Sequence, residues 1–164
     1  MKPKILLALD GSEPSMKAAH YVANLLGNRT DVSVTLFHVL SPIPSSLLES
    51  SGYEIPSTLW EAEFKRRKAS WEQSQQAFES ELFEQVREVF KGAGFRDEQI
   101  QTKYVVRRSE SDAAHEILKE CEEGDYDTVV MGKRGLSRIR TFLTGRVTEK
   151  VVRHAKGRAV WVIE

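Results

Sequence analysis

Five short apolar runs alternate with longer stretches in which apolar residues recur at helical spacing, and this alternation constrains the fold more than any other feature. Four of them occupy residues 5–9, 32–40, 128–131 and 159–163. The fifth segment, 100–107, also contains polar residues, and its apolar part is Tyr104-Val105-Val106 at the centre. Short runs that end at turn residues are typical of strands covered on both faces. Strands that alternate with helices form a parallel sheet with helices on both faces. The sequence therefore predicts an α/β fold with a five-stranded parallel sheet.

The stretches between these runs have the caps and spacing of helices. Ser12 suits the N-cap of the first helix, and Pro14 is tolerated in its first turn. Ser111 or Asp112 suits the cap of the helix that precedes the fourth strand. A single helix over residues 57–91 would be about 50 Å long. Because that length exceeds a compact domain of this size, we expect either a break in the helix or a first half that projects.

Composition narrows the class of protein. The chain has 164 residues, which predicts one domain over 1–164. Its 24 basic residues balance its 24 acidic residues, whereas a nucleic-acid-binding domain usually carries a basic excess. The longest apolar runs are too short to span a membrane. The single cysteine, Cys121, has no intramolecular partner. We therefore expect a cytoplasmic protein that binds neither nucleic acid nor membrane.

Two loops have residues suited to binding a phosphate. Asp10 and Gly11 follow the first strand, and Gly132, Gly135 and Gly145 follow the fourth. Ligands of open α/β sheets bind beyond the carboxyl ends of the strands. Glycine lets the backbone approach a ligand closely, and inward-facing amides bind anions. The alternative is that these glycines only form turns, and spacing alone does not decide between the two.

Positive charge surrounds the second loop. Gly145 directly precedes the predicted last helix, so the amides and positive dipole end of that helix would be available to a phosphate. The loop and the helix start also carry several basic side chains: Lys133, Arg134, Arg138, Arg140 and Arg146. The loop therefore has the charge that an anionic ligand requires.

Three segments resemble the universal stress protein family: LLALDGSEPS near the start, LFHVL in the second strand, and VVMGKRG with LTGRVTEKVV near the end. The glycines at 132, 135 and 145 match the spacing of the family's ATP-binding branch. The resemblance covers nearly the whole chain and is weakest in residues 41–75, a variable insertion. It implies a Rossmann-like sheet with strand order 3-2-1-4-5. It also implies ATP, with Mg or Mn, as the ligand.

Arg146 is a departure from that signature. The family's ATP-binding members have a serine or threonine after the last glycine, and this chain has Arg146. An arginine can bind a phosphate through two parallel hydrogen bonds. It can equally fill the phosphate space and pair with Asp10. The substitution therefore bears on whether the ligand is a triphosphate more than on whether a binding site is present.

The resemblance assigns a role to each matching position. Ala8, Leu9 and Asp10 would line the adenosine side, with Asp10 near the ribose, the phosphates or their metal ion. Val39 would contact adenine. The base and ribose would also meet Met131 and Gly132 at the end of the fourth strand, with Gly135 close by. The phosphates would meet the backbone amides at the start of the last helix, those of Gly145, Arg146 and Val147.

Two segments are candidates for protein contacts. The last strand, 159–163, is apolar and would lie at an edge of the sheet, where strands pair readily with other chains. The resemblance implies a homodimer through this strand. The insertion 41–75 carries Trp60, Phe64 and Trp71, which would form an interface if they are exposed.

The sequence favours a binding protein over an enzyme. We expect ATP binding in stress response or signalling. The alternative is a dimeric, nucleotide-independent interaction module in which Arg146 replaces the phosphates. A slow ATPase would have to use Asp10 as its general base, because no other side chain is evidently placed for that role. The four histidines, scattered over helices and a strand, have no metal-ligand spacing.

Overall fold

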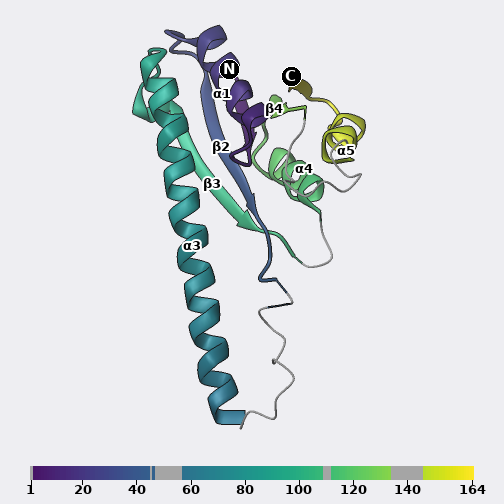
Figure 1. Cartoon of the computed structure of the whole chain (residues 1–164). Coiled ribbons are helices and arrows are strands. Elements are labelled where there is room, and N and C mark those ends of the chain that lie inside the picture. The colour runs from purple at the N-terminus through teal and green to yellow at the C-terminus, as the bar shows by residue number, and fades with distance from the viewer. Residues whose placement is uncertain (1, 45, 47–56, 109–111, 134–145) are drawn as a thin grey trace.

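The computed structural model describes residues 2–44, 46, 57–108, 112–133 and 146–164. Within this part of the chain, five parallel strands form one sheet in the order β3-β2-β1-β4-β5. Figure 1 shows the sheet with its connecting helices. The predicted α/β class and strand order are confirmed. The strands are β1 (Lys4–Leu9), β2 (Ser33–Leu40), β3 (Ile100–Val106), β4 (Thr128–Gly132) and β5 (Ala159–Ile163).

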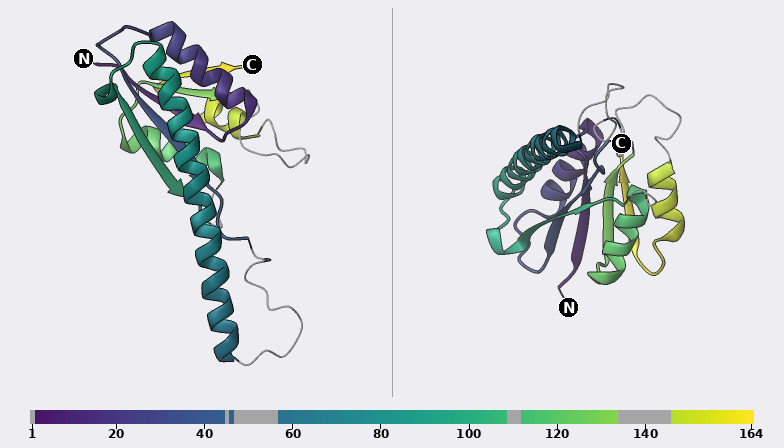
Figure 2. Two further views of the ribbon diagram at one scale, coloured as in Figure 1. Left: turned by 60° about the vertical axis from the view of Figure 1, so that its left-hand side comes forward. Right: turned by 90° about the horizontal axis from the view of Figure 1, so that it is seen from below.

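The helices form two layers. The helices α1 (Glu13–Leu26) and α3 (Ser57–Gly92) pack on one face of the sheet, and α4 (Ala113–Glu123) and α5 (Arg146–His154) pack on the other. Figure 2 shows the sheet between these layers. A short 3₁₀ helix, Asp97–Gln99, leads into β3.

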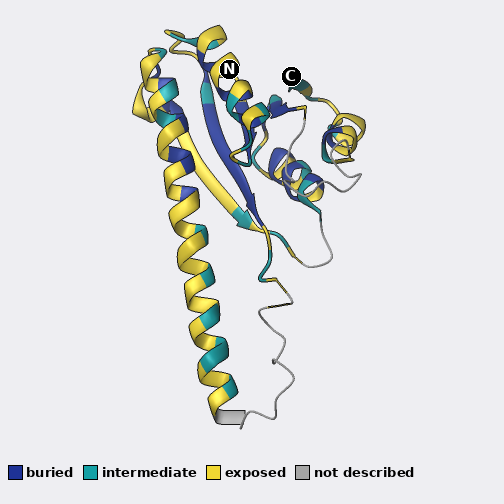
Figure 3. Ribbon diagram, viewed as in Figure 1, coloured by how far each residue is buried: buried dark blue, intermediate teal, exposed yellow. Residues whose placement is uncertain are grey.

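Each face of the sheet has its own apolar core. Leu7, Leu36 and Phe90 are fully buried on the α1/α3 face, and Leu6 and Phe37 are fully buried on the α4/α5 face. Successive residues of a strand point to opposite faces. Because both faces of β1 and β2 are covered, their sequences are continuously apolar rather than alternating. Figure 3 shows this burial along the central strands.

The predicted caps are confirmed where the structure describes them. The Ser12 side chain accepts a hydrogen bond from the amide of Ser15 at the start of α1. The Asp112 side chain accepts one from the amide of His115 at the start of α4. The alternative cap, Ser111, lies outside the described residues. These caps satisfy amides that have no partner within the helix.

Helix α3 is continuous and projects. It has 36 residues, or about 54 Å at 1.5 Å per residue. Its second half packs on the sheet through Leu82, Val86 and Phe90. Its first half extends well beyond the sheet, as Figures 1 and 2 show. Of the two expectations for this stretch, the projecting half is therefore correct and the break is not. No helix in the described part of the chain is long and apolar enough to cross a membrane.

Candidate functional site

The loop after β1 is held by its own polar side chains. The Asp10 carboxylate accepts hydrogen bonds from the Ser12 amide at 3.0 Å and the Ser12 hydroxyl at 2.5 Å. Gly11 has a φ of 75°, a conformation that favours glycine. Together these features turn the chain sharply from β1 into α1. Asp10 is therefore fixed at the carboxyl end of β1.

The end of β4 meets the start of α1. A Cβ on Gly132 would lie 2.5 Å from the carbonyl carbon of Pro14 and 2.7 Å from the amide nitrogen of Ser15. Only a glycine allows the two backbones to come this close. Because β1 and β4 are also neighbours in the sheet, the segments that follow them begin side by side. This adjacency of the two loops is what the strand order 3-2-1-4-5, implied by the family resemblance, requires.

The apolar core under the α4/α5 face reaches this meeting point. Ala8, Val39 and Met131 are buried in the same core there, and Val147 packs partly buried against it. These four predicted site residues come from four separate elements and are brought together by the fold. The side chain of Leu9 is buried on the opposite face. Only the main chain of Leu9 is therefore available on the α4/α5 side.

The start of α5 carries the charged part of the candidate site. Arg146 is its first residue and is exposed. The Thr148 hydroxyl lies 3.4 Å from the Lys133 carbonyl oxygen, which links α5 to the residue after β4. The Lys133 ammonium pairs with the Glu164 carboxylate. The predicted residues Gly135 and Gly145 lie outside the described part of the chain.

Sequence reasoning did not identify His38. Its side chain is buried, and its Nδ1 lies 2.7 Å from the carbonyl oxygen of Leu9, so Nδ1 donates a hydrogen bond to that oxygen. Burial lowers the pKa of the His38 imidazole below its usual value, and the Leu9 carbonyl and Asp10 partly oppose that shift. The histidine thus holds the main chain directly before Asp10 in place. Its role depends on the β1–β2 pairing, which spacing within either strand does not reveal.

Phe78 of α3 also contacts the loop after β1. A Cβ on Gly11 would lie 2.8 Å from the Cζ of Phe78, and the Phe78 and His38 rings lie 5.7 Å apart, centroid to centroid. The sequence alone does not place Phe78 against this loop. Because of this contact, α3 supports the backbone that carries Asp10.

The described residues offer no alternative metal or thiol chemistry. Among them, no group of three histidine, cysteine, aspartate or glutamate side chains could hold a metal ion. Cys121 is buried, and desolvation raises the pKa of its thiol to about 12. A thiol that stays protonated is a poor nucleophile.

Comparison with known proteins agrees with the fold. A family model described as "Universal stress protein family" matches residues 1–163. A putative universal stress protein from Staphylococcus aureus is 27% identical over 92% of this chain and 78% of its own length.

Two solved structures with nucleotide ligands share the fold. A universal stress protein in complex with cAMP has a TM-score of 0.63 and 18% identity, over 99% of this chain and 97% of its own. A universal stress protein from Archaeoglobus fulgidus in complex with dAMP has a TM-score of 0.53 and 16% identity, over 100% of this chain and 98% of its own.

Proposed function

Because this chain belongs to the universal stress protein family, we propose that it binds an adenine nucleotide where β1 and β4 end. The observation that carries the proposal is the close approach of Gly132 to the start of α1, with the end of the α4/α5-side apolar core beside it. The complexes of two proteins of the same fold with cAMP and dAMP support an adenine nucleotide as the ligand.

The end of this core suits the base. Ala8, Val39 and Met131 are packed and nonpolar, and they come from three adjacent parallel strands. A flat aromatic base placed against the end of such a core would itself be withdrawn from water, which favours binding. Asp10, next to Ala8 and Leu9 in the chain, is a hydrogen-bond acceptor suited to the ribose hydroxyls or to a metal ion on the phosphates.

The start of α5 suits the phosphates. Its N-terminal amides and dipole favour an anion, and Arg146 adds a guanidinium that binds phosphate oxygens in pairs. We propose ATP, with Mg²⁺ or Mn²⁺, as the nucleotide. The role is binding rather than catalysis. Among the residues that the structure describes at this site, the side chain suited to act as a base is Asp10, which already accepts two hydrogen bonds from Ser12.

Protein contacts form a second part of the proposal. β5 is an edge strand that pairs only with β4 among the described strands. Its residues from Val160 to Ile163 are half-buried. We propose that a second copy pairs along β5 and that residues 41–75 contact a protein partner.

Arg146 also supports a second candidate function. In place of the family's serine or threonine, its guanidinium would occupy the phosphate space, and the protein would then be a nucleotide-independent interaction module. The two functions predict opposite effects of shortening this side chain. If Arg146 binds the phosphates, Arg146→Ser weakens ATP binding about 10–100-fold, the value of a charge-assisted hydrogen bond. If Arg146 blocks them, the same substitution strengthens binding.

Calorimetric titration of the wild-type protein with ATP and Mg²⁺, and separately with AMP, tests the proposal. We expect a dissociation constant below 1 mM, on the order of ordinary cellular ligand affinities. Asp10→Asn should weaken binding. Asp31→Asn is the matched control, because Asp31 is exposed, precedes β2 and lies at the opposite end of the sheet. A wild-type protein that binds neither nucleotide refutes the proposal.

A further inference from the structure

The projecting half of α3 carries an aromatic stripe on one face. Trp60, Phe64, Arg67 and Trp71 are half-buried, whereas most residues between them are exposed. The Trp60 and Phe64 rings lie 6.3 Å apart, centroid to centroid. Phe78 follows Trp60 by 18 residues, which is about five helical turns, so it lies on the same face. We call residues 60, 64, 67, 71 and 78 the α3 stripe.

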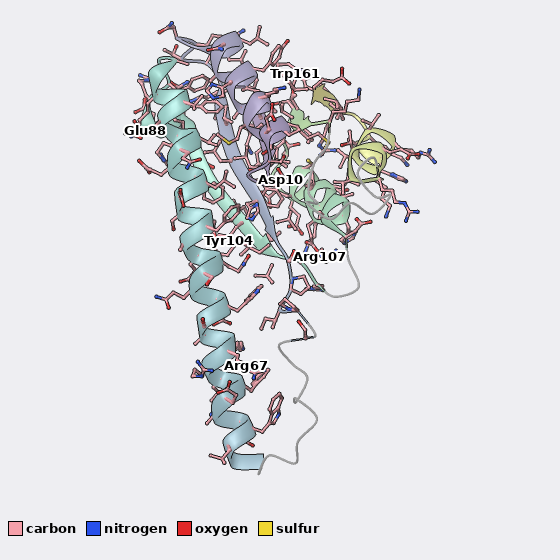
Figure 4. The ribbon with its side chains drawn as sticks, in the orientation of Figure 1. Asp10, Arg67, Glu88, Tyr104, Arg107 and Trp161 are labelled. Atoms are coloured by element: carbon pink, nitrogen blue, oxygen red, sulfur yellow. The ribbon has the colours of Figure 1, made fainter. Side chains whose placement is uncertain are left out.

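A second apolar patch lies where α3 reaches the sheet. Phe78, Tyr104 and Val106 are 44%, 47% and 54% exposed. Tyr104 is the β3 partner of His38, on which Phe78 packs, and Val106 points to the same face two residues later. Figure 4 labels Tyr104 on β3, the strand that lies alongside α3. We call Phe78, Tyr104 and Val106 the root patch, and Trp60 and Phe64, near the start of α3, the tip. Exposed or half-buried aromatic residues therefore lie at both places.

The tip and the root patch are placed symmetrically along the helix. Trp60 and Phe78 lie equally far from Ala69, and so do Arg67 and Trp71. A two-fold axis at the level of Ala69 would lay two copies of α3 antiparallel. Trp60 of each copy would then meet the root patch of the other. Contacts of this kind are self-complementary and close after two copies.

We propose that the α3 stripe is a homodimer interface, in which two α3 helices pair antiparallel about the level of Ala69. A partner of another sequence would have to match the tip and the root patch separately. A second copy matches both at once, because each surface is the complement of the other. Antiparallel pairing of projecting helices covers the aromatic side chains of both copies.

The charges along the stripe agree with this pairing. Arg67 lies within the stripe, where it would reach Trp71 of the other copy, a cation–aromatic contact. Its guanidinium is already oriented by Glu63, at 2.8 Å. Lys68 and Glu72 lie beside the stripe, one on each side of the two-fold axis. Within one copy, the Lys68 Nζ and the Glu72 Oε1 are 3.9 Å apart. The two-fold axis brings Lys68 of each copy to Glu72 of the other, so the pairing joins opposite charges.

This interface is separate from the one proposed for β5. β3, which carries the root patch, and β5 are the two opposite edges of the sheet. Loss of the α3 contact should therefore leave a monomer, or a dimer if copies also pair along β5, and in either case lower the mass of the assembly at least twofold. Light scattering after size-exclusion chromatography measures that mass against the monomer's 18.6 kDa.

Two substitutions on α3 test the proposal. Trp71→Lys removes the aromatic ring and places an ammonium group opposite Arg67 of the other copy, so that like charges meet twice in the interface, and we expect at least a twofold lower mass. Gln73→Lys is the control, since Gln73 is exposed on the same helix away from the stripe, and its mass should equal the wild type's. Equal masses for the wild type and both variants overturn the proposal. That result is expected if the stripe is covered by residues 45–56 of the same chain or by a different protein.

Disulfide cross-linking gives a second test that does not disturb the stripe's centre. Chains with Trp60→Cys and chains with Phe78→Cys are mixed and oxidised. The antiparallel pair predicts disulfides between the two kinds of chain. Disulfides only between like chains indicate a parallel pair and overturn the proposed geometry. Absence of any cross-link, with a monomeric mass for the wild type, overturns the dimer itself.

Discussion

Substitution of Gly132 by alanine tests the closest backbone contact in the candidate site. The added Cβ would lie 2.5 Å from the Pro14 carbonyl carbon, 2.6 Å from its oxygen and 2.7 Å from the Ser15 nitrogen. All three are backbone atoms in the first turn of α1, so no side-chain rotation relieves the clash. The helix start or the end of β4 has to move.

The expected loss of stability follows from that geometry. Overpacking of a well-packed interior costs about 1–3 kcal/mol. Since backbone atoms have to shift, we expect Gly132→Ala to lower the free energy of unfolding by about 2–3 kcal/mol, the upper part of that range. For a chain of this size, 1 kcal/mol corresponds to a change in Tm of about 2–4 °C, so the melting temperature should fall by about 4–12 °C.

Thermal and urea unfolding measure the effect, with Gly92→Ala as the matched control. No heavy atom lies within 4 Å of a Cβ built at Gly92, the last residue of α3. Alanine is favoured over glycine in helices by up to about 1 kcal/mol, so the control should be as stable as the wild type or more stable. If Gly132→Ala unfolds at the wild-type temperature, the β4 end and the α1 start are not in contact and the site as described is wrong.

Two further substitutions probe buried polar groups. The lowered pKa of His38 means that the unfolded state binds more protons once the pH falls below the unfolded value of about 6.5. The wild type should therefore lose stability between pH 7.5 and pH 5 in urea unfolding, and His38→Gln should lose less; equal losses contradict this reasoning. The Tyr126 hydroxyl lies 3.0 Å from the Thr35 hydroxyl and 3.3 Å from the Glu120 carboxylate. Tyr126→Phe should cost about 1–3 kcal/mol, whereas Tyr21→Phe, at an exposed ring, should change stability by less than about 0.5 kcal/mol; similar costs for both would be the contrary result.

Features set by neighbouring residues were predictable from the sequence. The strands were located to within one or two residues at each end, because continuous apolar runs and turn residues mark them. The Ser12 and Asp112 caps and the left-handed Asn28 after α1 also follow from local chemistry. The length of α3, 36 residues, predicted either a break or a projecting half, and the sequence did not decide between the two.

Features set by residues far apart in the sequence were not predictable from patterns. The hydrogen bond from His38 to Leu9 requires β1 and β2 to be paired in one register. The contact of Phe78 with Gly11 requires α3 to cross the end of β1. The position of Leu9 in the site followed from family resemblance, and its side chain turns to the opposite face because residues alternate along a strand.

The residues on the adenosine side could be predicted only in part. Ala8, Val39 and Met131 are ordinary buried residues by composition, and nothing local distinguishes them from Leu6 or Phe37. Their common position at the carboxyl ends of adjacent strands singles them out. That position follows from strand order, which the family resemblance implied and the sheet confirms.

Hydrogen exchange with and without ATP and Mg²⁺ tests most directly whether a nucleotide binds where β1 and β4 end. With nucleotide present, amides of residues 9–15, 131–133 and 146–148 should exchange more slowly, while those of residues 57–71 on the projecting half of α3 should be unchanged. Unchanged exchange at both strand ends, or protection confined to α3, would contradict the proposed site.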